Sequence, residues 1–568
     1  VTDIETANAT ARYDYNFTKE GFDINDHEAI SAENGKWHDT THGWVFESNG
    51  KIKVLMGGKG YIKMNLCQYS KTGKITLLDP KGKEVSSIDA KATKDGNLGI
   101  LQNESTESGE YTLTFEEGDT YIHSLSIVNM TNPTFAQNGN WIEVKAGDAQ
   151  SFITALEIAN GNNAAATRTY IFLPDGTYDL GDKCLTPISG NNISIIGESM
   201  DNTIIVNKPE VEGIGVTATL FNTSTGLYMQ DLTLKNAYPF DKSTGRAVCL
   251  QDKGTQTICK NVKMLSYQDT YYSNNNNGQY YFEGSDIHGI VDFICGGGDV
   301  FFNKCTLTLE PGKGSYITAP YTDGSDYGYV FDGCKIVGSA TDGFTFGRSW
   351  GGTAKCAFLN TILDKNAAAN IASTRWTTGG MNVVAKNFFE YNTVDENGKV
   401  ISPAENIVKF TTDKEVSEYN TIITAEKAAE FSLDKVFSNW KPAELAAQKS
   451  ASAATESNGK LAWEGDAQMY IVLKDGKFFA MTAEKSLDIA GATGSWSVRA
   501  ANEMGGFGQM TSIVTGIKNI ASAKDAATVS TAIFSVSGAQ QNSLQKGINI
   551  VVKTLADGSK KTEKVIMK

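Results

Sequence analysis

The middle of the chain reads Met229-Gln-Asp-Leu-Thr-Leu234, Cys259-Lys-Asn-Val-Lys-Met264, Phe282-Glu-Gly-Ser-Asp-Ile287, Phe302-Asn-Lys-Cys-Thr-Leu307, Phe331-Asp-Gly-Cys-Lys-Ile336 and Phe358-Leu-Asn-Thr-Ile-Leu363. In each copy the first and last residues are apolar, the fourth is small or apolar, and the second and third usually include Asn, Asp or Gly. Successive copies begin 20 to 30 residues apart, an interval typical of solenoids built from short strands and turns. The unequal spacing indicates coils whose outer loops differ while the inward-facing strand is kept. We therefore predict a right-handed parallel β-helix.

Strand patterns lie on both sides of these repeats, so we predict an all-β chain in which β-sandwich domains flank the parallel β-helix. Short apolar–polar alternations with Gly and Asn turns fill the N-terminal part and return after a small-residue linker near residue 450. Asp148 can cap a helix over about 148–160 that covers the exposed first coil. The expected domains are 1–135, an N-terminal β-sandwich; 136–447, the β-helix; 455–513, a second β-sandwich; and 514–568, a C-terminal β-domain.

Composition and charge argue against several classes of protein. The 568 residues include 51 Lys and Arg against 65 Asp and Glu, a net charge of −14, which argues against binding to nucleic acid or to an anionic membrane surface. The hydrophobic content of 40% is that of a globular chain and not of a disordered one. No run approaches 18 uninterrupted apolar residues, so we expect no transmembrane segment. We expect the protein to be a monomer.

The cysteines and histidines indicate neither a disulfide framework nor a metal centre. Eight Cys are too few for a disulfide scaffold, and no Cys-x-x-Cys pair occurs. Cys305 and Cys334 hold the same slot in successive copies of the repeat, so both are expected to point inward as small hydrophobic side chains. Of the five His, only His38 and His42 are four residues apart. Since no third ligand motif accompanies them, we interpret them as polar loop residues and expect no metal ion and no organic cofactor.

Two carboxylates follow successive copies of the repeat at the same distance. Asp269 lies five residues after Met264, and Asp292 lies five residues after Ile287. If the coils keep this register, the two residues stack about 4.8 Å apart, the spacing of neighbouring strands. Two carboxylates that close do not both ionise readily, so one pKa should rise while the other stays low. Such a pair suits a site with one acid and one nucleophile or base, although Asp is also common in turns.

Four runs surround these two residues: Gly245-Arg-Ala-Val-Cys-Leu250, Tyr267-Gln-Asp-Thr-Tyr-Tyr272, Val291-Asp-Phe-Ile-Cys-Gly296 and Phe346-Gly-Arg-Ser-Trp-Gly351. In order and spacing they resemble the Q-A-V-A-L, Q-D-T, D-F-I-F-G and L-G-R-P-W motifs of the pectin methylesterases, or pectinesterases, which are parallel β-helix enzymes. The resemblance covers about residues 140–447. It implies a carboxylic ester hydrolase that removes methyl esters from the galacturonic acid units of pectin and releases methanol, without a metal or an organic cofactor.

The resemblance also implies a role for each matching catalytic residue. Asp292 would be the nucleophile that attacks the ester carbonyl. Asp269 would protonate the departing methanol and then activate the water that hydrolyses the acyl-enzyme. Arg348 would hydrogen-bond Asp292 and keep it ionised, and Gln268 would donate to the oxyanion of the tetrahedral intermediate.

Four further positions are expected to contact the substrate. By the resemblance, Trp350 and Tyr272 would offer flat apolar faces to sugar rings. Arg246 replaces the first glutamine of the family pattern; it could donate to the oxyanion, bind a neighbouring free carboxylate or turn into a structural ion pair. Cys295 replaces an aromatic residue of the family pattern and removes a sugar contact. The Arg246 change predicts retained esterase activity with an altered preference for the methylation pattern.

The terminal domains add expectations about location. Segment 460–513 resembles fibronectin type III modules, and the last fifty residues resemble the C-terminal sorting or anchoring domains of exported Gram-negative proteins. Both imply an exported enzyme in the periplasm, at the cell surface or outside the cell. The N-terminal sandwich could bind carbohydrate through Trp37 or Trp44, or could serve only as a packing module.

Two other functions stay open. A β-helix polygalacturonase or lyase would also act on pectin, but the N-T-D, D-D, G-H-G and R-I-K motifs of the polygalacturonases are missing, as is a compact acidic calcium cluster. A catalytically inactive pectin-binding protein on the same solenoid is the third hypothesis, because Arg246 departs from the family pattern. Homogalacturonan or a branched pectin is the expected partner in each case.

Overall fold

The computed structural model describes residues 12–69, 72–90, 93–105, 107–116, 118–129, 135–161, 167–240, 245–312, 315–338, 343–515, 528–555 and 560–567. The chain divides into two compact units. One contains residues 1–450, 466–471 and 499–509, and the other contains the remaining residues from 451 onward. Among the described residues, no helix is long and apolar enough to cross a membrane.

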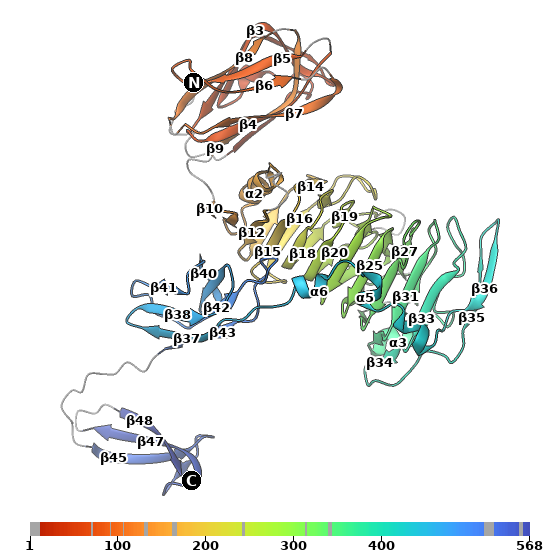
Figure 1. Cartoon of the computed structure of the whole chain (residues 1–568), viewed down its shortest axis with the longest axis vertical. Helices are drawn as coiled ribbons and strands as arrows, with labels where there is room; N and C mark the ends of the chain where they lie inside the picture. Colours follow the sequence, from red (N-terminus) through yellow and green to blue (C-terminus); the bar gives the residue numbers. More distant parts are fainter. Residues whose placement is uncertain are drawn as a thin grey trace. The chain divides into compact units, whose positions relative to one another are not determined.

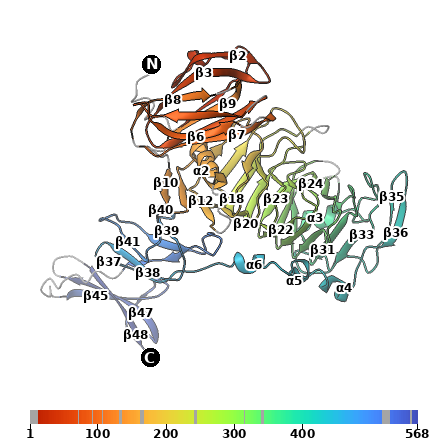
Figure 2. The same ribbon diagram turned by 45° about the horizontal axis from the view of Figure 1, so that its top comes forward.

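The N-terminal region is a nine-stranded antiparallel sheet that encloses its own apolar core (Figure 2). Its strands are β1 Arg12–Asn16, β2 Ile30–Asp39, β3 Gly43–Met56, β4 Gly60–Gln68, β5 Gly73–Leu78, β6 Glu84–Ala90, β7 Thr93–Asn103, β8 Gly109–Glu116 and β9 Thr120–Asn129. They run in the order β6-β5-β8-β3-β9-β4-β7, with β1 paired to β9 and β2 paired to β3. Ile52 and Val54 of β3 and Leu113 of β8 face the core, because successive side chains of a strand point to opposite faces.

The two tryptophans that were candidates for carbohydrate binding are packing residues. Trp44 is buried, and its indole N–H donates to the carbonyl oxygen of Phe22 at 2.9 Å. Trp37 packs against the edge of the same core and donates to the carbonyl oxygen of Phe17 at 3.1 Å. These contacts favour the alternative that the two rings serve packing.

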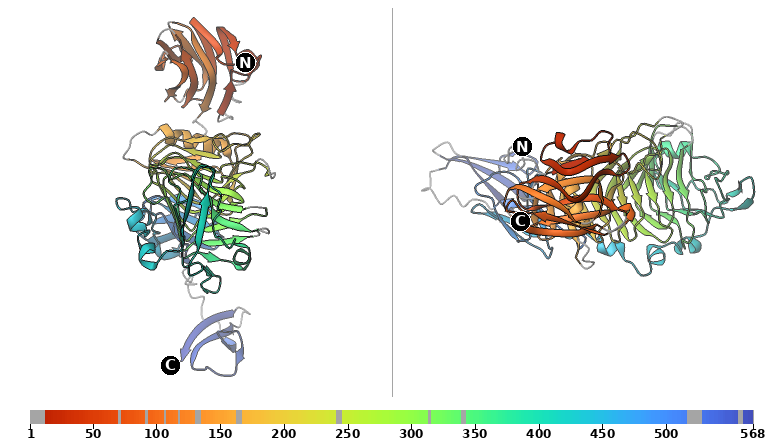
Figure 3. Two further views of the ribbon diagram at one scale, coloured as in Figure 1. Left: turned by 90° about the vertical axis from the view of Figure 1, so that its right-hand side faces the viewer. Right: turned by 90° about the horizontal axis from the view of Figure 1, so that it is seen from above.

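A stack of parallel strands forms the β-helix expected from the repeats (Figure 1). The larger sheet contains β10 Phe135–Asn138, β11 Trp141–Val144, β12 Thr169–Leu173, β13 Gly176–Asp179, β15 Ile193–Gly197, β16 Thr203–Asn207, β18 Tyr228–Asn236, β20 Thr257–Leu265, β22 Gln279–Glu283, β23 Asp286–Gly289, β25 Asp299–Asn303, β26 Thr306–Leu309, β28 Tyr329–Asp332, β29 Lys335–Gly338, β31 Lys355–Leu359, β32 Ile362–Leu363, β33 Asn387–Tyr391 and β34 Val394–Asp395. The smaller sheet contains β14 Thr186–Ile188, β17 Leu220–Asn222, β19 Leu250–Asp252, β21 Tyr271–Ser273, β24 Val291–Gly296, β27 Ser315–Pro320 and β30 Phe344–Gly347. Figure 3 shows the successive coils side by side in its right-hand view.

The register of the stack follows the sequence repeats residue by residue. The first residues of successive copies pair in parallel: Met229 with Cys259, Cys259 with Phe282, Phe282 with Phe302, Phe302 with Phe331, and Phe331 with Phe358. The third residue of every copy has a φ between 51° and 64°, at Asp231, Asn261, Gly284, Lys304, Gly333 and Asn360. Gly adopts this left-handed conformation freely, and Asn and Asp adopt it more readily than most residues, which explains their recurrence at this corner. The predicted parallel β-helix is confirmed.

Stacked side chains fill the interior of the coils. Phe282, Phe302, Phe331 and Phe358 form a ladder whose ring centroids lie 4.9, 4.4 and 4.2 Å apart. Burial of apolar surface contributes about 25 cal/mol per Å² to the free energy of folding and is the main source of stability in such a core. The repeat therefore encodes both the strand register and the filling of the coil.

The expected inward cysteines and the expected capping helix are both present. Cys305 and Cys334 are fully buried and carry free thiols, as predicted for small hydrophobic side chains. Helix α2, Ala149–Gly161, buries Phe152 and Leu156. The Asp148 carboxylate accepts from the backbone N–H of Ser151 at 3.2 Å, which satisfies one of the free donors of the first turn.

The remaining elements follow the β-helix stack in the sequence. Within and after its last coils come α3 Lys365–Asn370, the hairpin of β35 Ile407–Thr411 and β36 Val416–Asn420, and the short helices α4 Ala425–Ala429, α5 Leu433–Val436 and α6 Pro442–Leu445. Two four-stranded sheets follow: β37 Ser452–Ser457, β38 Lys460–Glu464, β41 Ser486–Asp488 and β44 Val514–Thr515 in one, and β39 Tyr470–Lys474, β40 Lys477–Thr482, β42 Trp496–Ala500 and β43 Thr511–Ser512 in the other. The last sheet is antiparallel and contains β45 Thr528–Ser535, β46 Gln540–Gln541, β47 Gly547–Leu555 and β48 Lys560–Met567.

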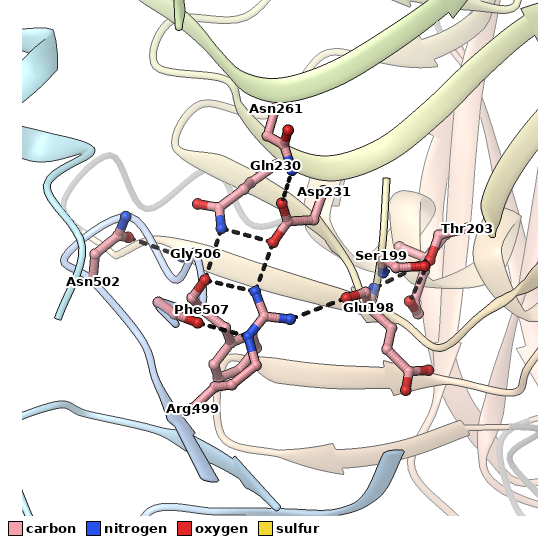
Figure 4. A network of polar contacts seen from close by, with 12 residues as sticks. Glu198, Ser199, Thr203, Gln230, Asp231, Asn261, Arg499, Asn502, Gly506 and Phe507 are labelled. Carbon is pink, nitrogen blue, oxygen red and sulfur yellow. Dashed lines mark hydrogen bonds and ion pairs between the residues drawn. The ribbon is translucent and has the colours of Figure 1, made fainter. Parts of the chain in front are cut away.

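Residues 499–509, which we call the docking segment, bind the outer face of the first coils through polar contacts (Figure 4). The Arg499 guanidinium donates to Asp231 at 2.8 Å and to the carbonyl oxygen of Glu198 at 3.0 Å. The side chain of Gln230 donates to the carbonyl oxygen of Phe507 at 2.9 Å. Arg499 and Asp231 are both largely shielded from solvent, so breaking this ion pair would leave a buried charge without its partner.

Apolar packing completes the attachment of the docking segment. Phe507 is fully buried, with its ring centroid 6.2 Å from that of Trp141 and 5.7 Å from that of Phe172. A Cβ atom on Gly506 would lie 1.9 Å from the amide oxygen of Gln230. Only glycine therefore lets the segment approach this closely. A segment far along the sequence thus belongs to the packing of the β-helix.

Replacing Phe507 with alanine is expected to lower the free energy of unfolding of the β-helix unit by about 3–5 kcal/mol, because a buried aromatic ring is removed and a cavity is left. The measurement is hydrogen exchange of β12, β15 and β18 in increasing denaturant, since a chain of several domains does not unfold in one two-state step. Met510→Ala is the control: this side chain is 61% exposed, and its loss should change stability by no more than about 0.5 kcal/mol. Equal effects of the two substitutions would contradict a stabilising role of the docking segment.

Candidate active site

One pocket on the β-helix gathers most of the predicted site residues. Seven of the eight line it together with Ile214, Ala319 and Met381: Arg246, Gln268, Asp269, Asp292, Cys295, Arg348 and Trp350. The eighth, Tyr272, lines a neighbouring pocket that shares Trp350. The residues come from four runs far apart in the sequence, and the stacking of the coils brings them together.

The backbone register stacks the two carboxylates, as the sequence spacing predicts. Gln268 pairs in parallel with Arg246 on one side and with Val291 on the other, and the N–H of Asp269 donates to the carbonyl oxygen of Val291 at 3.3 Å. Asp269 and Asp292 have φ values of 58° and 48°. Non-glycine residues adopt this left-handed conformation only at some cost, and such costs concentrate at functional sites.

Asp292 is held by an ion pair with Arg348. The guanidinium donates through Nε to Oδ1 at 2.9 Å and through Nη2 to Oδ2 at 2.5 Å, a bidentate arrangement that fixes the carboxylate in one orientation. The Arg348 guanidinium also lies 4.5 Å above the ring of Tyr316, which orients the arginine in turn. Burial raises the pKa of Asp292, while the hydrogen bonds and the charge of Arg348 oppose that rise and favour the ionised form.

The carboxyl group of Asp269 has different surroundings. Burial is the largest cause that raises the pKa of Asp269 to about 8, followed by the negative charge of Asp292; the charges of Arg246 and Arg348 oppose the rise. The surroundings thus favour the protonated form of Asp269 at neutral pH, while the hydrogen bonds and the charge of Arg348 favour the ionised form of Asp292. Surroundings that differ in this way suit one carboxylate to act as an acid and its neighbour to act as a nucleophile.

The small side chains of Cys295 and Ala319 leave an open space above the carboxylates. Cys295 and Ala319 pair in adjacent strands β24 and β27, and both are buried at the floor of the pocket. The Cys295 thiol donates to the carbonyl oxygen of Tyr271 at 3.7 Å. Burial raises the pKa of Cys295 well above its ordinary value, so the thiol stays protonated and is not a nucleophile.

Aromatic rings and amides form the neighbouring pocket. The ring centroid of Trp350 lies 6.2 Å from that of Tyr272 and 5.6 Å from that of Tyr321. Asn274 and Asn276 line the same pocket, and the Tyr272 hydroxyl donates to the Asn274 side chain at 2.9 Å. Flat apolar faces beside neutral hydrogen-bonding groups suit a sugar ring and its hydroxyls.

Arg246 lines the catalytic pocket and is also in an ion pair. Its Nε and Nη2 donate to the two carboxylate oxygens of Glu212 at 2.6 and 2.5 Å. The hydrogen bonds from Arg246 lower the pKa of Glu212, and the positive charge of Arg246 partly opposes the rise in the pKa of Asp269. Of the alternatives left open for Arg246, the structure shows the ion pair, although the side chain keeps its place at the pocket rim.

Sequence reasoning missed Glu212, Ile214, Tyr316 and Met381. Ile214, Met381 and Glu212 lie in loops between strands, where the repeat pattern carries no information about position. Tyr316 begins the β27 coil and could have been found by counting coils from Asp292, since Val291 pairs with Tyr316.

Comparisons with known proteins agree on one family. The family model described as Pectinesterase matches residues 143–438. Putative pectinesterase 11 of Arabidopsis thaliana is 30% identical over 233 residues, which are 40% of this chain and 63% of that protein. Probable pectinesterase A of Aspergillus niger is 24% identical over 262 residues, 43% of this chain and 76% of that protein.

The aligned part of some relatives is smaller still. The chain covers 43% of Probable pectinesterase/pectinesterase inhibitor 16 of Arabidopsis thaliana, at 26% identity over 236 residues. Among solved structures, the pectin methylesterase PemA from Erwinia chrysanthemi matches 50% of this chain and 93% of its own, with 23% identity and a TM-score of 0.39.

Proposed function

Since the chain belongs to the pectinesterase family, we propose that it hydrolyses the methyl esters of galacturonic acid units in pectin and releases methanol. The observation that carries this proposal is the pair of neighbouring carboxylates in one pocket with contrasting surroundings. Asp292 is in a bidentate ion pair with Arg348, and burial raises the pKa of Asp269 to about 8.

The first half of the reaction forms an acyl-enzyme. The Asp292 carboxylate attacks the ester carbonyl, and the tetrahedral intermediate places its oxyanion where Gln268, and the positive charge of Arg246 near it, can stabilise it. Asp269 gives its proton to the methoxy oxygen, and methanol leaves as the C–O bond breaks. The sugar is then joined to Asp292 as a mixed anhydride.

The second half of the reaction uses the same two residues, with Asp269 now acting as the base and Asp292 as the leaving group. Asp269, now ionised, takes a proton from water while the water oxygen attacks the anhydride carbonyl. Collapse of this intermediate releases galacturonic acid, which loses its proton to solvent, and returns Asp292 as a carboxylate paired with Arg348. Asp269 is protonated again, so both residues are ready for the next ester.

The neighbouring pocket supplies a place for the next sugar along the chain. We assign Trp350 and Tyr272 to stacking against sugar rings, and the narrow side chain of Cys295 to the floor of the ester pocket. The amides of Asn274 and Asn276 carry no charge, so binding of a sugar in this pocket does not require a free carboxylate on that sugar.

The terminal domains and the location of the enzyme are part of the same proposal. We propose that 1–135, 455–513 and 514–568 are accessory β-domains around the catalytic region 136–447. The resemblance of 460–513 to fibronectin type III modules, and of the last fifty residues to the sorting or anchoring domains of exported Gram-negative proteins, supports an exported enzyme that meets pectin in the periplasm, at the cell surface or outside the cell.

The test is methanol release from highly methylated pectin, with polymer length followed in the same tube. Methanol without chain shortening is the expected result. Shortened chains without methanol would move the function to a pectin-cleaving hydrolase or lyase. If neither product formed from linear or branched pectin while the protein still bound the polymer, the inactive pectin-binding protein would be the better description.

Replacing Arg246 with glutamine is expected to keep methanol release and to change which pectins are preferred. Arg246 carries a positive charge at the rim of the pocket, so its loss should lower kcat/KM for partly demethylated pectin relative to fully methylated pectin by up to about fivefold, the size of an exposed charge pair. Glu212→Gln is the matched variant: it removes the counter-charge and should shift the ratio in the opposite direction. If both variants left the rate and the product pattern unchanged, a specificity role for Arg246 would be lost.

A further inference from the structure

The turn between β2 and β3 brings three potential metal ligands together. It reads His38-Asp-Thr-Thr-His42. The Nδ1 atom of His38 lies 2.8 Å from Oδ2 of Asp39, and the Nδ1 atom of His42 lies 2.8 and 2.9 Å from the two carboxylate oxygens. One ligand atom from each of the three side chains lies within 4.8 Å of the others. The sequence analysis assigned no third ligand to this histidine pair; the fold places the Asp39 carboxylate against both imidazoles.

The carboxylate at the centre of this cluster is held in place by the turn itself. The backbone N–H groups of Thr41 and His42 donate to Oδ1 of Asp39 at 2.8 and 2.7 Å. Both backbone bonds go to Oδ1, whereas Oδ2 faces the Nδ1 atoms of His38 and His42. A cation would replace the ring protons between these atoms, and the turn already holds the carboxylate in the orientation that this requires.

Aromatic neighbours limit the movement of the two imidazole rings. The ring of Tyr121 packs edge-on against His38 with centroids 5.2 Å apart, and it lies 5.5 Å from the ring of His42. Tyr69 packs edge-on against His42 at 5.4 Å. Ligands whose rotamers are fixed by packing lose little conformational entropy on binding, which favours affinity.

We propose that His38, Asp39 and His42 form a binding site for Zn²⁺ in the N-terminal sheet. Two neutral imidazoles and one carboxylate are a donor set that Zn²⁺ accepts in tetrahedral geometry, with water in the fourth position. On binding, each Nδ1 offers its lone pair to the cation while Nε2 carries the ring proton. Ca²⁺ and Mg²⁺ need more oxygen ligands than this cluster contains.

The cluster is open to solvent and separate from the carboxylate pair of the active site. His38 and Asp39 side chains are each 41% exposed and His42 is 24% exposed, so a hydrated cation can enter. In the part of the chain that the structure describes, no other group of three such side chains has its ligand atoms this close together. The site is thus independent of the proposed ester hydrolysis.

His288 provides a natural comparison within the same protein. It also contacts two carboxylates, but Glu310 bonds to its Nδ1 and Asp286 to its Nε2. Because the two acids lie at opposite ring nitrogens, their oxygens do not converge on one point. This histidine is therefore the matched control for nonspecific binding to imidazole and carboxylate groups.

The experiment is calorimetric titration of the full chain with ZnCl₂, repeated with Co²⁺ to record the visible absorption of a tetrahedral complex. We expect one equivalent of Zn²⁺ to bind. His38→Gln and His42→Gln should each weaken binding by at least about 100-fold, the upper end of what losing an outer partner costs. His288→Gln should leave the affinity unchanged, and circular dichroism of the metal-free variants should match the parent protein.

Three results would overturn the proposal. One is the absence of a one-to-one binding event in the parent protein. Another is equal Zn²⁺ affinity in the parent and in the His38→Gln, His42→Gln double variant. The third is a loss of affinity in His288→Gln as large as that in His42→Gln. His38 is exposed and its replacement leaves the buried core untouched, so a misfolded His42 variant would not prevent the test.

Discussion

Replacing Asp292 with asparagine is expected to lower kcat for methyl-ester hydrolysis by roughly 10⁴-fold or more, the loss seen when a covalent nucleophile is removed. Asparagine has nearly the same shape, so the pocket should keep its form, but its amide oxygen is not a nucleophile at neutral pH. Its amide N–H would also face one of the two guanidinium donors that now bond the carboxylate at 2.9 and 2.5 Å. The measurement is methanol release from highly methylated pectin.

Trapping of the intermediate separates this role from general-base catalysis by Asp292. An acyl-enzyme is an activated carbonyl, so hydroxylamine added during turnover should give the hydroxamate of galacturonate with the parent protein and none with Asp292→Asn. Retention of more than about one per cent of the parent rate by Asp292→Asn would contradict its role as nucleophile. Unchanged pectin binding by the variant would show that the loss lies in the chemical step.

The β-helix could be predicted because its physical requirements repeat in the sequence. Each coil needs an inward apolar residue at the same place, and Phe302 and Phe331 meet this need in register. Each coil also needs a left-handed corner, which selects Asn, Asp or Gly, as at Asn261 and Gly284. Because each requirement recurs once per coil, the same residue types recur along the sequence, and their positions predict the register of neighbouring strands.

The carboxylate pair could be predicted for the same reason, since Asp269 and Asp292 lie at fixed distances after two copies of the repeat. The spacing also predicts that the two pKa values differ, but it does not say which carboxylate keeps its proton, because the Arg348 ion pair and the burial of Asp269 depend on side-chain packing between coils. Family resemblance supplied Arg348 as a candidate, whereas its support by Tyr316 emerged only from the fold.

The repeat pattern could not predict contacts made by loops and by segments far apart in the sequence. Glu212 lies in a loop of irregular length, and no repeat places it beside Arg246. Arg499 pairs with Asp231 across 268 positions of sequence. The need for glycine at position 506 is likewise visible only in the fold, where the Gln230 side chain leaves no room for a Cβ atom. Trp44 shows why the sequence leaves two alternatives open: an aromatic residue in a strand suits a core as well as a sugar, and its burial in the fold favours the core.

Replacing Asp269 with asparagine is expected to lower kcat by about 10²- to 10⁴-fold, the usual contribution of a general acid–base group. In the parent enzyme, kcat/KM should fall as the pH rises through about 8, because the proton that methanol needs leaves Asp269 there. The rate should also fall at acid pH, where Asp292 becomes protonated and loses its nucleophilic form. The measurement is the pH dependence of kcat/KM for both proteins; in Asp269→Asn the loss of activity near pH 8 should disappear.

In the Asp269→Asn variant, stability should move in the direction opposite to activity. The pKa of Asp269 is higher in the folded chain than in the unfolded one, so between the ordinary Asp pKa of about 3.8 and the folded value of about 8 the folded state binds the extra proton. The contribution of this residue to stability therefore declines as the pH rises through that range. Asparagine carries no such penalty, so Asp269→Asn should be at least as stable as the parent at pH 8 while being far less active. A variant that was both less stable and inactive would point to a structural role of Asp269. If kcat/KM of the variant still fell near pH 8, the ionisation there would belong to another group.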